Sequence, residues 1–358
     1  MSKTIALFLA LLWSGAALAQ ETELRDAILD PMPVRDQFLL SNGLLSFEPE
    51  GPRVLEIGEW AFDLHHADSN TFSKSNWISH SLSTETRNQR EQGSTILADP
   101  RYQLRDSVFL IDGETHRVTL GLRRGFGAHV EIGIEVPVET VGGGWSDAAI
   151  ESVHNTLRIG NAERDAFARN VETVYVRTPG VTYLRDRSAG YELGDVAISA
   201  KYELARLEDQ KFSAAVTGTI ELPTGSAATL DGSGSLDAGA RLIVSHDLGG
   251  GRLNASFGVI HLGQNAPLGL KPQTLITDTL GYAHRVSDRT AVVAQLTVSE
   301  TPFRQYNFPE LSRRAYQLSV GAQHAMRHYT FHVAFIENVI TFENSADAGL
   351  QWGISRRF

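Results

Sequence analysis

The sequence contains no cysteine, so no disulfide can stabilise its fold. If the chain is exported, it depends on sheet closure and side-chain packing alone. Long apolar runs are also missing after the first 19 residues, where no stretch approaches the roughly 18 consecutive apolar residues of a transmembrane helix. A basic surplus is missing as well, because the formal net charge is −10, and this argues against a nucleic-acid partner.

Residues 1–19 have the order of a secretory signal peptide. Lys3 is followed by an apolar run at 5–13, and a small-residue site of the A-x-A type ends at Ala19. A buried N-terminal helix would instead need an amphipathic pattern, which this run lacks. We therefore expect the chain to be exported and residues 1–19 to be removed.

From residue 54 onward, apolar and polar residues alternate in successive segments, which is the pattern of half-buried strands. The connections alternate too: long at 67–114, short at 124–127, long at 138–194. Tight turns at one rim and long loops at the other are typical of outer-membrane barrels. We predict an all-β fold for residues 54–358, an antiparallel up-and-down transmembrane β-barrel of about twelve strands (10 to 14) with short periplasmic turns and long extracellular loops. The predicted strands are 54–66, 115–123, 128–137, 195–205, 211–222, 235–248, 252–262, 275–285, 290–300, 314–324, 328–338 and 348–358.

The two faces of these segments differ consistently. One face is nearly free of charge over the roughly 9 to 11 residues with which a tilted strand crosses a bilayer. In a soluble sandwich such faces would meet in a core, and each strand alone permits that alternative. The hairpin-linked strands and the export signal favour a barrel whose apolar face contacts outer-membrane lipid. Predicted outward residues are Val118, Leu120, Leu122, Val130, Ile132, Ile134, Val136, Val196, Ile198, Ala200, Tyr202, Leu204, Phe331, Val333 and Phe335.

Residues 20–53 precede the predicted barrel and are rich in proline, with prolines at positions 31, 33 and 49. Proline at this density disfavours both a helix and a central strand. Two short apolar runs, at 38–40 and 44–47, could pack against other apolar parts of the protein. We expect either an extended segment that enters the barrel mouth, and is then a candidate plug of the lumen, or a solvated leader.

Aromatic residues gather near the ends of the outward faces, where an interface girdle places them. On the last strand, Trp352, Ile354 and Phe358 share one apolar face, and Arg356 is its single exception. A final strand that ends in an outward aromatic residue looks like the signal that the outer-membrane assembly machinery recognises. The girdle candidates are Trp60, Tyr202, Phe212, Tyr282, Tyr316, Tyr329, Trp352 and Phe358.

The whole mature chain resembles a bacterial family of outer-membrane β-barrel proteins that is catalogued as a domain of unknown function and is similar in pattern to the meta-pathway phenol-degradation porins. The resemblance implies location and architecture, and it implies no substrate. The motifs that carry it, in order, are PMPVRDQFLLSNGLLSFEPE at 31–50, LIDGETHR at 110–117, GIEVPVETVGGGWSD at 133–147, GDVAISAKYEL at 194–204, ELPTG at 221–225 and FIENVITFENSADAGLQWGISRRF at 335–358.

The inward faces carry charges of both signs. Rings of charged side chains filter solutes in channels, so one interpretation is a charged pore for a small solute. The other is a salt-bridged interior in which the charges satisfy one another, and a lumen of about twelve strands permits both. The lumen candidates are Arg117, Arg123, Glu131, Glu135, Asp195, Lys201, Glu203, Glu221, Asp237, Arg241 and Arg252, together with Lys211, Arg285 and Arg357.

Other patterns give weak support to chemistry. A four-residue turn at 324–327 would set Ser319 opposite His332, a pairing that a hydrolase could use, but both would point into the lumen. His65 and His66 are adjacent and would point to opposite faces, so at most one could join Asp63, and two ligands do not make a metal site. We therefore expect a surface or rim role for them and predict no catalytic residue, metal or cofactor.

The second long connection contains a candidate helix. Trp145, Ala149, Val153 and Leu157 recur every four residues, which predicts a short amphipathic helix that packs over the barrel mouth or acts as a gating lid.

The function predicted from the sequence is a passive outer-membrane channel or transporter for small solutes, apolar ones included. The alternatives are a barrel with a closed lumen that has a structural or binding role, and a barrel hydrolase that acts on lipid.

Overall fold

A computed structural model describes residues 26–81, 90, 93–100, 105–158, 163–185, 190–207 and 211–358. The predicted signal peptide, residues 1–19, lies outside the described residues.

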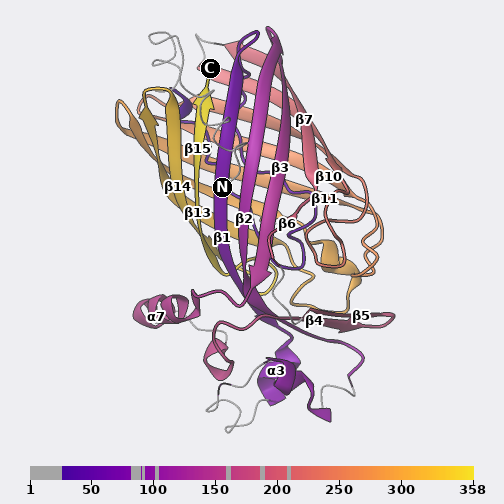
Figure 1. Ribbon diagram of the computed structural model, residues 1–358. Coiled ribbons are helices and arrows are strands. Elements are labelled where there is room, and N and C mark those ends of the chain that lie inside the picture. Colours follow the sequence, from indigo (N-terminus) through magenta and orange to yellow (C-terminus); the bar gives the residue numbers. More distant parts are fainter. Residues whose placement is uncertain are drawn as a thin grey trace.

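Twelve long antiparallel strands form a barrel, which closes because β1 pairs with β15. Figure 1 shows the strands standing side by side around the barrel, with the C-terminus at one end. The predicted fold and strand number are confirmed. The barrel strands are β1 (Trp60–Lys74), β2 (Val108–Gly127), β3 (Val130–Gly142), β7 (Val196–Leu207), β8 (Phe212–Leu222), β9 (Asp237–Asp247), β10 (Gly251–Leu262), β11 (Gln273–Ser287), β12 (Thr290–Ser299), β13 (Ala315–Met326), β14 (Tyr329–Asn338) and β15 (Ala348–Arg357).

The first strand lies further along the chain than the predicted range 54–66. The backbone N–H groups of Val54 and Leu55 donate to the side chains of Glu203 and Glu131, so these residues enter the lumen before the ladder begins. The register between β1 and β2 then continues as far as Lys74 opposite Leu110. Both strands thus run past the point at which alternation fades in the sequence.

Short and long connections alternate around the barrel as predicted. Two or three residues join the strands at what we call the short-turn end, at 128–129, 248–250, 288–289 and 327–328. The opposite rim, the long-loop end, carries the connections 75–107, 143–195, 223–236, 263–272, 300–314 and 339–347.

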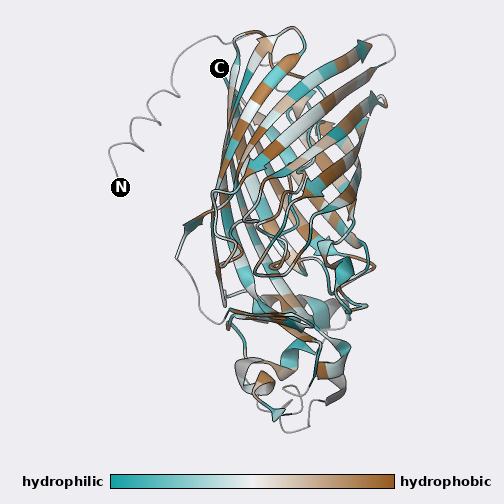
Figure 2. Cartoon of the chain, turned by 90° about the vertical axis from the view of Figure 1, so that its right-hand side faces the viewer, coloured by the Kyte–Doolittle hydropathy of each residue, from teal (hydrophilic) through white to brown (hydrophobic). Residues whose placement is uncertain are grey.

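The outer face of the barrel is apolar, and the predicted orientation of the strands is confirmed. Figure 2 shows apolar and polar residues alternating along the strands. Leu280, near the middle of β11, is 56% exposed, and its neighbour Thr279 faces inward. Large exposed apolar side chains occur on nearly every barrel strand, among them Leu120, Ile134, Ile198, Ile220, Leu242, Phe257, Val292, Val320, Phe335 and Leu350.

The aromatic girdle is concentrated at the short-turn end. Tyr316 instead begins β13 at the long-loop end, and Trp352 lies in the middle of β15, where it stacks on His66. The girdle candidates near the short-turn end are Trp60, Tyr202, Phe212, Tyr282, Tyr329 and Phe358.

A small sheet extends from the long-loop end, beyond the barrel (Figure 1). β4 (Thr173–Thr178) pairs with the extended part of β2, and β5 (Val181–Arg185) pairs with β4. β6 (Glu192–Leu193) is separate from this sheet and pairs with β3 in the barrel wall. The β4–β5 hairpin was not predicted, although Pro179-Gly180 between two alternating runs is a turn signal. The remaining elements are the helices α3 (Asn76–Ser81), α5 (Gly93–Leu97) and α7 (Asp147–Leu157) and the 3-10 turns η2 (Arg164–Ala166) and η4 (Pro302–Gln305).

Among the described residues, no helix has the length and apolar character that would be needed to span a bilayer.

A matched pair of substitutions tests the orientation of the strands. Leu280→Arg should lower the free energy of unfolding by about 2 to 4 kcal/mol, because it places a cation against lipid near midplane. Thr279→Arg should cost much less, because its side chain enters the polar lumen. Urea titration of protein refolded into lipid vesicles measures both, and equal costs would contradict the assigned faces.

Candidate functional site

The barrel interior holds the segment that precedes β1. Residues 28–47 are largely buried although they lie outside every strand. Gln295 of β12 accepts the N–H of Met32 (3.0 Å) and donates to its carbonyl oxygen (2.8 Å). Gln351 of β15 accepts the N–H of Arg35 and donates to its carbonyl oxygen in the same way. These amides replace the backbone partners that a neighbouring strand would supply.

Two further lumen amides hold the same segment. Gln323 donates to the carbonyl oxygens of Ile28 and Asp30, and Asn254 donates to that of Leu29. These amides are not among the lumen residues predicted from the sequence, all of which are charged. The sequence signal that could have identified them is their place at inward positions of strands in which apolar and polar residues alternate.

Ion pairs connect the segment to the barrel wall. Glu50 lies 2.8 Å from Lys201 Nζ, pairs with Arg241 and accepts a hydrogen bond from Thr217. Glu48 lies 3.4 Å from His65 Nδ1. The N-terminal segment therefore supplies carboxylates to a wall that carries cations.

Near the short-turn end, Arg252 forms ion pairs with three carboxylates. Its guanidinium lies 2.9 Å from Asp26, 2.8 Å from Asp30 and 2.6 Å from Asp247. Arg53 also pairs with Asp26. The start of the segment is thus anchored at the opposite end of the lumen from its apolar part.

The wall itself contains cross-strand ion pairs. Arg123 binds both oxygens of Asp63, at 2.8 and 3.1 Å, and lies 3.3 Å from Glu131 across the β2–β3 turn. Arg117 lies 2.9 Å from Glu139, which also accepts a hydrogen bond from Asn42 of the segment.

The other predicted lumen residues have separate roles. Asp195 accepts N–H bonds from Gly225 and Ser233 and so holds the loop 223–236. Asp237 accepts the N–H of Gly263, and Glu203 pairs with Arg206. Two carboxyl groups remain: Glu221 has a buried oxygen without a hydrogen-bond partner, and Glu135 lines the internal cavity.

Little free space remains beside the segment. A central cavity of about 190 Å³ is bounded by wall residues of both signs, among them Arg117, Arg123, Glu135 and Lys201. A second cavity of about 340 Å³ lies at the short-turn end, and Lys211 and Arg285 line it. Arg357 borders the central cavity. In the described part of the chain, the N-terminal segment and paired charges thus occupy much of the lumen.

An apolar core seals the long-loop end. It joins the two apolar runs of the segment to side chains of the loops 263–272 and 300–314 and of the β4–β5 sheet. Gly43 allows a close approach of two backbones, because a Cβ there would lie 2.6 Å from the backbone of Leu230 and Gly232. The members of this core include Phe38, Leu39, Leu40, Leu44, Phe47, Phe109, Leu230, Leu268, Phe303, Tyr306, Phe308 and Leu311.

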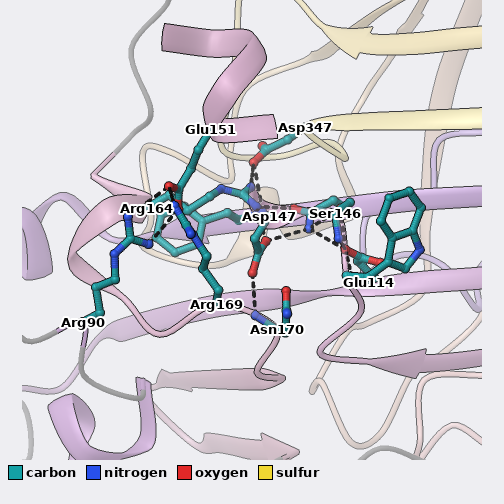
Figure 3. Close-up of polar contacts among 12 residues, drawn as sticks. Arg90, Glu114, Ser146, Asp147, Glu151, Arg164, Arg169, Asn170 and Asp347 are labelled. Carbon is teal, nitrogen blue, oxygen red and sulfur yellow. Dashed lines mark hydrogen bonds and ion pairs between the residues drawn. The ribbon is translucent and has the colours of Figure 1, made fainter. Parts of the chain in front are cut away.

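A polar cluster fastens the second long loop beside this core (Figure 3). Arg164 binds Asp147 at 2.7 Å and also pairs with Asp347 of the loop before β15. Glu151 binds Arg90 (2.9 Å) and Arg169 (3.1 Å), and the hydrogen bonds from Arg90 and then Arg169 lower its pKa to about 2.

The predicted helix is present as α7, but it buries a different face. Trp145 precedes the helix and is exposed, as is Ala149, whereas Asp147, Ile150 and Glu151 are buried. The side chains of Val153 and Leu157 are outside the described residues. The acidic face of the helix is buried because its two carboxylates form ion pairs with arginines.

The predicted serine–histidine pair does not form. The β13–β14 register sets Ser319 opposite Ile336 and Gln323 opposite His332. Four residues along a strand correspond to about 13 Å, too far for a nucleophile and its base. The connection is shorter than predicted because Arg327 adopts a positive φ (49°) in a two-residue turn.

The predicted surface or rim position is wrong for His65, whereas His66 does lie on the outer surface. His65 faces the lumen in the middle of β1, where it packs against His332 with ring centroids 5.2 Å apart. His66 faces outward and stacks on Trp352. Among the described residues, no group of three or more His, Asp or Glu side chains could hold a metal ion.

The predicted assembly signal remains a prediction. Trp352 and Ile354 lie on the outward face of β15, and Phe358 follows its last residue.

Substitution of Glu151 tests whether its ion pairs hold the second long loop. At pH 7, Glu151→Gln should make residues 143–172 several-fold more sensitive to limited proteolysis, because both arginine pairs are lost. In the wild type the ion pairs contribute their full stabilisation above pH 4.5, the ordinary pKa of a glutamate. This stabilisation is lost as the pH falls toward the lowered pKa of about 2.

Cleavage of the wild type by pepsin should therefore accelerate between pH 4 and pH 2. Glu192→Gln, an exposed residue of the same connection, is the control. Equal cleavage of Glu151→Gln and the wild type at pH 7 would show that the pairs do not hold the loop.

Comparison with solved structures shows the fold class. The crystal structure of the COG4313 outer membrane channel from Pseudomonas putida F1 is 12% identical, covers 87% of this chain and 100% of that chain, and superposes with a TM-score of 0.56. This barrel is therefore of the outer-membrane type. The NanC porin (9% identity, 82% of this chain, 98% of that chain, TM-score 0.43) and the P. putida toluene transporter TodX (8% identity, 85% of this chain, 90% of that chain, TM-score 0.36) are more distant.

No curated protein matches the chain. A family model matches residues 31–358, which include the lumen segment from its first proline and all twelve barrel strands. The chain belongs to the family described as "Protein of unknown function (DUF3187)".

Proposed function

We propose that the protein is an outer-membrane channel for small solutes and that residues 20–53 close its lumen as a plug. The observation that carries the proposal is the composition of the lumen, which is charged on the wall and occupied by a segment that belongs to no strand. In this proposal residues 1–19 are the signal peptide and 54–358 the barrel domain. The lumen residues named above then line the path of the solute.

The way the segment is bound supports a removable plug. Its contacts are hydrogen bonds to glutamine side chains and ion pairs with wall residues, and water can replace both kinds of contact. A segment integrated into the barrel would instead pair its backbone with a strand along its length. The apolar seal at the long-loop end adds the main resistance to displacement.

The solute must suit two surfaces. It meets apolar and aromatic side chains at the long-loop end and paired charges in the lumen below. A small solute with polar and apolar parts fits this sequence of surfaces, and alternating charges favour no single sign of ion.

One alternative retains a specific observation. The filled interior, with a central cavity of only about 190 Å³, also fits a structural or binding barrel whose lumen never opens. The lipid hydrolase has lost its supporting pair, because Ser319 lies opposite Ile336.

Single-channel recording separates the channel from the closed barrel. The refolded mature protein in a planar bilayer should be mostly silent, and a variant lacking residues 20–53 should conduct steadily. A shorter deletion, residues 20–25, retains every lumen contact described above and should stay silent. Silence of the longer deletion would favour the closed barrel, and steady conductance of the full-length protein would show that the segment does not obstruct the lumen.

A milder variant tests the plug without a deletion. Glu48→Gln/Glu50→Gln should raise the open probability at least about tenfold. Breaking a buried ion pair typically costs about 3 to 5 kcal/mol, and about 1.4 kcal/mol corresponds to a factor of ten. Glu56→Gln, an exposed residue just after the plug, is the control and should leave the open probability unchanged. Equal open probabilities in both variants would contradict anchoring by these carboxylates.

A further inference from the structure

Arg124 lies on the outward face of β2, near the short-turn end of the barrel. Its guanidinium lies 4.8 Å from the ring centroid of Trp60 and 5.1 Å from that of Phe126. The residue is half-buried, and its Nε is buried without a hydrogen-bond partner. The aromatic rings therefore hold the cation in place without neutralising it.

Arg356 repeats this arrangement on β15. It is the residue that interrupts the apolar face of the last strand, and it is only 6% exposed. Its guanidinium lies 5.5 Å from the centroid of Tyr329 and 5.7 Å from that of Phe358. Its Nε and Nη1 are buried without hydrogen-bond partners.

The two arginines lie on either side of β1. Arg124 is opposite Trp60 on one neighbouring strand, and Arg356 is opposite Phe62 on the other. Two strand spacings and a shift of two residues along β1 separate their backbones, which corresponds to about 12 Å. They therefore form one patch on the outer surface, at the depth of the aromatic girdle.

This patch lacks the counter-charges that are found inside the barrel. Lumen arginines such as Arg123 and Arg252 bind carboxylates at hydrogen-bond distance. Within the described part of the chain, neither Arg124 nor Arg356 has a carboxylate within ion-pair distance. An unpaired cation beside the apolar zone is costly, and a negative group from outside the chain would offset that cost.

We propose that Arg124 and Arg356 bind the phosphate of an anionic glycerophospholipid in the leaflet at the short-turn end. Lipid is the medium that contacts this face, and its phosphates lie at the depth of the aromatic girdle. A guanidinium offers two parallel donors to one phosphate. Two unpaired cations favour a lipid with net negative charge over a zwitterionic one, whose ammonium group would add a third cation.

Native mass spectrometry of the refolded mature protein tests this site. Released from micelles with equimolar phosphatidylglycerol and phosphatidylethanolamine, the wild type should retain phosphatidylglycerol preferentially. Arg124→Gln/Arg356→Gln should lower the retained ratio of phosphatidylglycerol to phosphatidylethanolamine at least fivefold. Refolding in vitro bypasses the assembly machinery, so an effect on assembly does not obscure the result.

The control removes the same charge at the long-loop end. Arg304 and Arg314 both pair with Glu300, so Arg304→Gln/Arg314→Gln should keep the preference. Absence of a preference in the wild type, or an equal loss in both double variants, would overturn the proposal. If the glutamine pair does not refold, Arg124→Lys/Arg356→Lys replaces it: the cations remain, so the preference should weaken and persist, and its complete loss would overturn the proposal. These outcomes are independent of the proposed channel function.

Discussion

The structure depends on the closure of a sheet whose outer face meets lipid. Backbone polar groups in a bilayer find no water, so every strand needs two hydrogen-bonded neighbours. The ladder between β1 and β15, from Ala61 opposite Arg357 to Asn70 opposite Ala348, removes the two free edges. Once closure and an apolar outer face are fixed, the period of two sends every intervening side chain inward. The charged lumen is a consequence of that geometry.

An interior full of charges is stable only when the charges are paired. The wall supplies part of the pairing itself, as Arg117 and Glu139 do across β2 and β3. The rest comes from the N-terminal segment. Its Glu50 pairs with both Lys201 and Arg241 of the wall. Its Asp26 and Asp30 both pair with Arg252. The segment is therefore bound by the groups that a solute pathway would expose.

The sequence predicted the features that depend on local periodicity. Strand number, the alternation of turns and loops, and the orientation of faces follow from period two and from connection lengths. Features that depend on register or on distant pairing could not be predicted in this way. A four-residue turn would place Ser319 opposite His332, but the β13–β14 turn is two residues long, with Arg327 in a left-handed conformation, and Ser319 lies opposite Ile336. The partners of Glu50 are more than 150 residues away, so no local pattern identifies them.

Distant partners also decide which face of α7 is buried and how Arg356 is accommodated, and local periodicity predicts neither. The four-residue spacing of apolar residues predicted that the apolar face of the helix is buried. The acidic face is buried instead, because arginines outside the helix pair with it. Arg356 also breaks a local pattern, and here the partners are aromatic rings on either side. A cation on the outer face costs little near the interface and several kcal/mol at midplane. Its place at the end of the last strand, among girdle aromatics, is therefore where an outward arginine is tolerated and where lipid phosphate can reach it.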